Sequence, residues 1–203
     1  VQRLKPRYNP KVNDWWMCDE GRFGFKYVND KKRIVSPVVR RGMESTSPSW
    51  PAIPDILRFR FEEHVRERGP DKVAALLSPF MTCEEAWLLA KFIREVAPQS
   101  TLAMGPVPLE GEDQSFPAGS EKPRFTILKE KCPNRRGIET LLTRSGGRTS
   151  TFAEFQSAAV KGAFTAIWIV GGYPKPWVDK ETAKIAEQVE LLVVQDMFES
   201  DFI

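Results

Sequence analysis

Short apolar runs recur along the later part of the chain, and they predict buried strands. The clearest are residues 72–77, 165–170 and 190–195, which are almost wholly apolar, as in strands covered on both faces. A shorter run at residues 101–104 predicts a fourth strand. Helical spacing of apolar residues predicts helices between these runs, over residues 55–68, 82–96, 136–142, 152–161 and 179–187.

Local signals mark where several of these helices begin and end. Thr82 to Glu85 and Thr151 to Glu154 each have the spacing of a capping box, in which a hydroxyl and a carboxylate satisfy two orphan amides. Asp55 is placed to cap the first helix, which Gly69 and the proline after it would end. Strand, helix and strand at this spacing predict an α/β fold, with an open, mostly parallel sheet flanked by helices in a Rossmann-like arrangement.

Two regions lack this alternation. Residues 1–54 hold six of the sixteen prolines and little helical periodicity, so we expect an irregular N-terminal part, with the α/β domain over residues 55–203. Residues 105–136 form a connection far longer than the usual ~4–6 residues, which is typical of a functional or mobile loop.

Composition narrows the class of protein. Thirty basic and 27 acidic side chains give a net charge of +3, with the basic excess in the first 41 residues, which is too weak a signal for nucleic-acid binding. No apolar run approaches the ~20 residues of a membrane-spanning helix, so we expect no direct membrane span. Three widely spaced cysteines argue against a disulfide framework and favour a reducing compartment.

Few residues suggest catalysis. His64 is the only histidine and stands among charged residues, so we expect it on a solvated helix face. Cys83, in the first turn of a helix, and Cys132, among basic residues, have no companion thiol, and we expect both to be structural or incidental. We therefore predict no catalytic residue. Gly171 and Gly172 follow a predicted parallel strand, where backbone amides can meet a phosphate, and are a weak cofactor-binding candidate without the spacing of an NAD site.

The run from Arg3 to Arg22, with Cys18 near its end, resembles the segment that carries the fourth cysteine of a [4Fe-4S] site in the molybdopterin oxidoreductase superfamily. The match is closest to the large peripheral iron-sulfur subunit of NADH:quinone oxidoreductase, complex I. Residues 69–91, 166–174 and 191–196 also resemble that subunit. The resemblance implies that Cys18 is a metal ligand of a [4Fe-4S] cluster, that residues 1–54 are the end of the cluster-bearing subdomain, and that the chain is a fragment whose other three ligands lie elsewhere in the parent protein.

The resemblance also implies a function and its setting. Molybdenum relatives often place a basic residue after the last cysteine, whereas Asp19 and Glu20 stand here, so molybdopterin is unlikely by this comparison and an electron-transfer subunit is favoured. Its partners would be the other subunits of a respiratory NADH dehydrogenase complex, in the cytoplasm and peripheral to the inner membrane. The alternatives are part of a molybdenum or tungsten bis-pterin-guanine-dinucleotide enzyme, such as an NAD-linked formate dehydrogenase, and a non-redox scaffold or assembly module.

Overall fold

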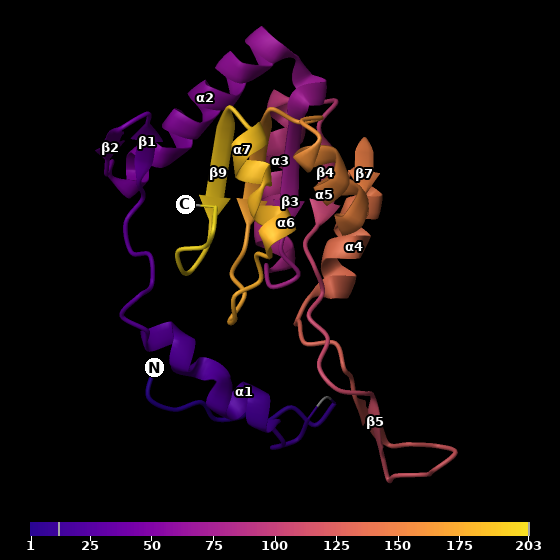
Figure 1. Cartoon of the computed structure of the whole chain (residues 1–203). Helices are drawn as coiled ribbons and strands as arrows, with labels where there is room; N and C mark the ends of the chain where they lie inside the picture. The colour runs from indigo at the N-terminus through magenta and orange to yellow at the C-terminus, as the bar shows by residue number, and fades with distance from the viewer. Residues whose placement is uncertain (12, 203) are drawn as a thin grey trace.

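A five-stranded parallel sheet lies at the centre of the computed structural model, which describes residues 1–11 and 13–202 (Figure 1). The strand order is β7-β4-β3-β8-β9, and every neighbouring pair is parallel. The strands are β3 (Val73–Leu77), β4 (Thr101–Met104), β7 (Arg148–Ser150), β8 (Ala166–Val170) and β9 (Leu191–Gln195). The predicted α/β class with a mainly parallel sheet is confirmed.

Helices cover both faces of the sheet, as β3 makes clear. Its residues alternate between two cores, because successive side chains of a strand point to opposite faces. Val73, Ala75 and Leu77 join the core that includes Phe61 and Ile93, whereas Ala74 and Leu76 join the core that includes Phe155 and Ile185. The first core lies under α2 (Ile53–Arg68), α3 (Cys83–Val96) and α4 (Arg135–Arg144), and the second under α5 (Phe152–Val160), α6 (Lys180–Ala183) and α7 (Ile185–Gln188).

Both predicted capping boxes form. The Thr82 hydroxyl accepts from the Glu85 amide at 3.2 Å, and the Glu85 carboxylate accepts from the Thr82 amide at 2.9 Å. Thr151 and Glu154 make the same pair of bonds at the start of α5. The Asp55 cap was wrong, since α2 begins two residues earlier and Asp55 lies in its first turn.

The sheet edges differ from the prediction. The short strand β7 was not predicted, because its residues are polar and largely exposed. At the opposite edge β9 is apolar but only half-buried, since β8 is its one partner in the sheet. The helix expected over residues 179–187 is two short helices that meet at Lys184, and the Asp179 side chain caps the first by accepting from the Thr182 amide at 2.7 Å.

The N-terminal part passes beneath the carboxyl ends of the strands in the view of Figure 1. It is less irregular than predicted, because it contains α1 (Asp19–Phe23), the 3-10 helices η1 (Gly24–Asn29) and η2 (Trp50–Ala52), and a hairpin of β1 (Val39–Arg41) and β2 (Glu44–Thr46). The Ile34 amide donates to the Met197 carbonyl at 2.9 Å, which ties this part to the segment after β9. A third 3-10 helix, η3 (Pro70–Lys72), leads into β3.

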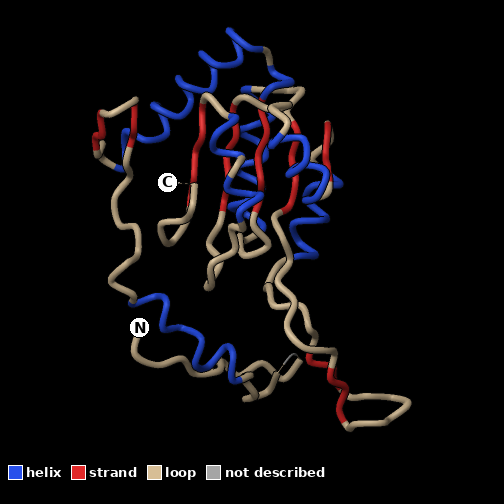
Figure 2. Tube along the Cα trace, in the orientation of Figure 1, coloured by secondary structure: helices blue, strands red, loops and turns tan. Residues whose placement is uncertain are grey.

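The long connection after β4 is an ordered arm that projects away from the sheet (Figure 2). It carries an antiparallel hairpin of β5 (Gln114–Phe116) and β6 (Phe125–Ile127). Sequence periodicity did not predict this hairpin, because strands of three residues are too short to produce a recognisable pattern. None of the helices that the structure describes is long and apolar enough to cross a bilayer.

Candidate functional site

The strand order reverses at the carboxyl ends of β3 and β8. From β3 the chain proceeds to β4 and β7 on one side, and then returns to β8 and β9 on the other. In an open parallel sheet such a reversal leaves a crevice in which ligands commonly bind. The residues that leave these strand ends are Ser78 after β3, Gly105 after β4 and Gly171 after β8.

Tyr173 fills this crevice. Its side chain is 3% exposed, and its ring lies 4.9 Å from that of Phe80 and 4.8 Å from that of Trp177. The Tyr173 hydroxyl donates to the Pro106 carbonyl at 2.9 Å, and burial raises the pKa of this phenol well above its ordinary value. Gly105 leaves room for the hydroxyl, since an added Cβ there would lie 2.6 Å from it. A dinucleotide seated in the crevice would have to displace this ring.

Asp196, directly after β9, organises the neighbouring Gly171 and Gly172 turn. Its carboxylate accepts from the Gly172 amide at 2.9 Å and from the Trp177 indole at 3.0 Å. The Gly171 amide donates to the Gln195 carbonyl at 2.9 Å, and an added Cβ at Gly171 would meet the Asp196 carboxylate. Both turn amides therefore have partners within the protein. The assignment of this pair to a cofactor stays a prediction.

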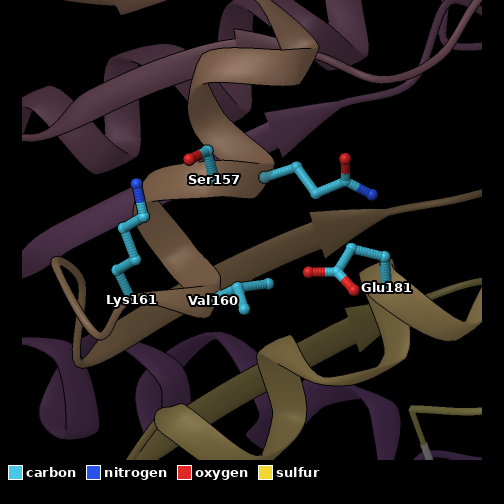
Figure 3. A pocket seen from close by; sticks show the side chains of 5 residues that line it. Ser157, Val160, Lys161 and Glu181 are labelled. Carbon is cyan, nitrogen blue, oxygen red and sulfur yellow. The ribbon is translucent and has the colours of Figure 1, made fainter.

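A cleft of about 920 Å³ opens beside this closed crevice. Its walls come from the N-terminal part and from the loops after β8 and β9, and they include Lys26, Tyr27, Lys175 and Trp177. Acidic side chains, among them Asp196, balance the lysines, so the cleft has no strong preference for an anion or a cation. A smaller pocket of about 170 Å³ lies between α5 and α6 (Figure 3).

The small pocket is the gap between the packed side chains of α5 and α6. Figure 3 shows Ser157, Val160, Lys161 and Glu181 around it. Glu181 is paired with Lys184 at 2.6 Å, and the Gln156 amide, also at the pocket, donates to the Thr182 hydroxyl at 2.7 Å. The Gln156–Thr182 bond holds α5 to α6, and the Glu181–Lys184 pair lies at the end of α6, so both have structural roles.

Cys18 lies far along the chain from these strand ends, immediately before α1, with its side chain exposed. Its sulfur accepts a hydrogen bond from the Gly21 amide at 3.3 Å, and its carbonyl accepts from the Arg22 amide at 2.9 Å. Amide hydrogen bonds to sulfur are among the features that tune cysteine-ligated clusters. Among the described residues no three His, Cys, Asp or Glu side chains are placed to hold a metal, so Cys18 offers one thiolate of the four that such a cluster needs. The side chain of Glu20, next to Asp19, lies outside the described residues.

Cys83 lies next to Asn134, two residues after Cys132, but among the described residues neither cysteine belongs to a group that could hold a metal. The Cys83 thiol is 3.7 Å from the Asn134 side-chain oxygen. The Cys132 thiol is 3.6 Å from a Glu130 carboxylate oxygen, and burial, with Glu130 adding to it, raises the pKa of Cys132. The basic residues around Cys132 therefore do not activate it, in part because Arg135 pairs with Glu130 at 2.5 Å.

The prediction for His64 was wrong. The side chain is 7% exposed, and its Nε2 lies 2.8 Å from the hydroxyl of Thr165, which directly precedes β8. Burial lowers the pKa of His64 below its ordinary value of 6.5. One turn later on α2, Arg68 pairs with Glu190, which directly precedes β9, at 2.9 Å.

No family model matches the chain, but comparison with curated proteins finds oxidoreductases. Over 95 residues, 46% of this chain, it is 34% identical to a subunit of the NADH-quinone oxidoreductase of Streptomyces coelicolor. Over 96 residues, 47% of the chain, it is 28% identical to "Probable oxidoreductase YjgC" and also to "Putative formate dehydrogenase YrhE", both of Bacillus subtilis. These alignments cover 11%, 10% and 10% of the three relatives, so the chain matches about a tenth of their length. The chain is thus similar, over nearly half of its length, to oxidoreductases of the NADH-quinone oxidoreductase and formate dehydrogenase-like kinds.

Proposed function

We propose that this chain is part of an iron-sulfur electron-transfer subunit of an NADH:quinone oxidoreductase. In this proposal Cys18 provides one thiolate to a [4Fe-4S] cluster of the parent protein, and the α/β domain serves mainly as scaffold. The cluster, when bound, would supply one-electron transfer. The 34% identity to a subunit of an NADH-quinone oxidoreductase supports the redox class. The remaining cluster ligands, and the other subunits of a cytoplasmic, membrane-peripheral complex, would come from outside this chain.

The observation that carries the choice among redox proteins is the position of Tyr173. A pterin dinucleotide enzyme needs an open site for its cofactor, whereas here a buried tyrosine occupies the crevice at the strand-order reversal. The adjacent turn amides are also taken up by Asp196 and Gln195. This arrangement favours a subunit without molybdenum or tungsten chemistry.

The second candidate is part of a molybdenum or tungsten enzyme. The similarity to a formate dehydrogenase-like protein, at 28% identity over a comparable length, favours it. In that case the pterin dinucleotide would have to bind in the cleft of about 920 Å³, which Tyr173, Trp177 and Asp196 line together with residues of the N-terminal part. A scaffold without any metal is the third candidate, which the exposed, single Cys18 thiol allows.

Metal analysis of the protein expressed from its complete reading frame separates these candidates. We would measure iron, sulfide, molybdenum and tungsten, and record low-temperature EPR spectra after reduction with dithionite. Several iron-sulfur signals without molybdenum or tungsten are expected. A metal-pterin signal would refute the proposal in favour of the molybdenum or tungsten enzyme. A protein without any bound metal would refute it in favour of the scaffold.

Substitution of Cys18 tests the ligand assignment itself. Cys18→Ala should remove about four iron atoms per protein and one [4Fe-4S] signal, because a cubane cluster of this kind is held by four thiolates. Cys83→Ala is the matched control, since Cys83 is also exposed but has no assigned ligand role. Unchanged iron content in Cys18→Ala would refute the assignment, provided that circular dichroism confirms a folded α/β domain in both variants.

A further inference from the structure

The outer side of β9 is a free sheet edge. Among the described residues, β8 is the only strand that pairs with β9. The Leu191 amide and the Gln195 carbonyl bond to the residues that directly precede and follow β8, at 3.1 and 2.9 Å. Backbone groups of successive residues point to opposite sides of a strand, so the amides and carbonyls of Leu192 and Val194 point away from β8.

β9 lacks the features that usually protect an edge strand. Such strands are commonly short, charged or bulged, because their free amides and carbonyls can pair with another chain. At the opposite edge β7 follows this rule, since it has three residues, all polar and largely exposed. β9 instead has four apolar residues in succession, Leu191 to Val194, and no charge. Its composition is that of an inner strand of a parallel sheet.

The apolar side chains of β9 are incompletely covered on both faces of the sheet. Leu191 and Val193 pack against the core under α2, α3 and α4, whereas Leu192 and Val194 pack against the core on the other face. All four are only half-buried. A strand on the outer side of β9 would bring further side chains beside both pairs. The occupant that suits this edge is therefore an extended segment that is apolar on both of its faces.

The first half of α2 points to the same missing neighbour. In its second half, Phe61 and Val65 pack on the core, whereas Ile56 and Leu57 are half-buried and belong to neither core that the described residues form. In the view of Figure 1, this end of α2 continues past β9 toward the β1–β2 hairpin. A strand added at the outer edge of β9 would lie on the side to which this end of α2 extends.

The N-terminal part limits what can approach this edge. The Ile34 amide donates to the Met197 carbonyl, two residues after β9, at 2.9 Å. Figure 1 shows the chain between η1 and β1 on the outer side of β9. One added strand requires only ~4.7–4.9 Å beside β9, whereas a second copy of the whole domain would have to come between β9 and this segment. A single strand therefore suits the edge better than a sheet-to-sheet dimer.

We propose that β9 is an inner strand of the assembled protein. Through the outward amides and carbonyls of Leu192 and Val194 it pairs with one apolar strand, which comes from a segment of the parent protein outside these 203 residues. The alignments cover about a tenth of the relatives' length, so a parent of that size has ample chain to provide the strand. The inference rests on the proposed function for the existence of this parent, but on no metal.

Amide hydrogen exchange in the protein expressed from its complete reading frame tests the pairing. Mass spectrometry with fragmentation would resolve single amides of β9. The amides of Leu192 and Val194 should exchange within roughly tenfold of those of Leu191 and Val193, which face β8. Exchange of the outward amides at least about a hundredfold faster than that of the inward ones would overturn the inference, because unpaired amides at an edge exchange without any opening of the sheet.

A pair of variants in the same protein provides a second measurement. Val194→Pro and Val194→Ala both remove the branched side chain, but only proline removes the outward amide. Proline is tolerated on a free edge and not within a sheet, so Val194→Pro should accelerate exchange at Leu191 and Val193 roughly tenfold more than Val194→Ala does. Equal exchange in the two variants would overturn the inference. If Val194→Pro does not fold, the exchange of the wild-type protein decides.

The source of the strand and the proposed function are tested separately. Protection of Leu192 and Val194 that falls on dilution, together with a dimeric mass by light scattering, would assign the edge to a second copy and overturn the inference. Slow exchange in a protein without iron would support the added strand and refute the electron-transfer assignment. Fast exchange in a protein with its iron-sulfur clusters would overturn the added strand and leave that assignment intact.

Discussion

Substitutions at Gly105 and Tyr173 should be strongly coupled, because one hydroxyl group links them. An alanine Cβ at Gly105 would lie 2.6 Å from the Tyr173 hydroxyl oxygen, but 3.7 Å from the ring carbon that bears it. The first distance is too short, whereas the second is an ordinary van der Waals contact. Gly105→Ala should therefore be damaging only while the hydroxyl is present.

The magnitudes follow from these contacts. Gly105→Ala alone should destabilise the protein by about 1–3 kcal/mol, as for overpacking in a dense interior. Tyr173→Phe alone should cost about 1 kcal/mol, because the Pro106 carbonyl loses its donor. The double variant should be about as stable as Tyr173→Phe, since the new methyl then fits and alanine also reduces the entropy of the unfolded chain. The coupling energy is thus about 1–3 kcal/mol.

Urea denaturation followed by tryptophan fluorescence would measure the free energy of unfolding of the four proteins in this cycle. Gly24→Ala combined with Tyr173→Phe is the control cycle, because no atom lies within 4 Å of an added Cβ at Gly24. That cycle should be additive. Additivity within ~0.3–0.5 kcal/mol in the Gly105 cycle as well would refute the conclusion that the Tyr173 hydroxyl fills the crevice.

Two further predictions concern polar groups in the core and at the strand ends. Burial lowers the pKa of His64, so its neutral form is favoured in the folded state, and the stability this provides is present above pH 6.5 and lost as the pH falls through the folded pKa. Urea midpoints at several pH values should show this loss in the wild type and a smaller one in His64→Gln; equal profiles would contradict it. Asp196→Ala should cost at least about 2 kcal/mol, because the Gly172 amide and the Trp177 indole lose their acceptor. Thermal denaturation followed by circular dichroism would measure the effect, and an unchanged melting temperature would contradict it.

Several features of the candidate site were open to sequence reasoning but were missed. Tyr173 and Asp196 each come shortly after an apolar strand, and neighbouring parallel strands place such residues at one edge of the sheet. The apolar pattern of these strands says nothing of which side chain enters the crevice. His64 was misjudged because its neighbours in sequence are charged, although its own side chain faces Thr165.

The sequence by itself determined the four apolar strands β3, β4, β8 and β9, the helices α2 to α5, the capping boxes of α3 and α5 and the parallel α/β class, because these depend on apolar periodicity and on bonds between residues three or four apart. The tertiary structure alone decided what those elements bring together. Tyr173 closes the crevice between β3 and β8, Asp196 binds the turn after β8, and Phe125 meets Trp16 from more than a hundred residues away. The physical reason is that such contacts depend on strand order, arm direction and side-chain volume, which no local pattern in the chain encodes.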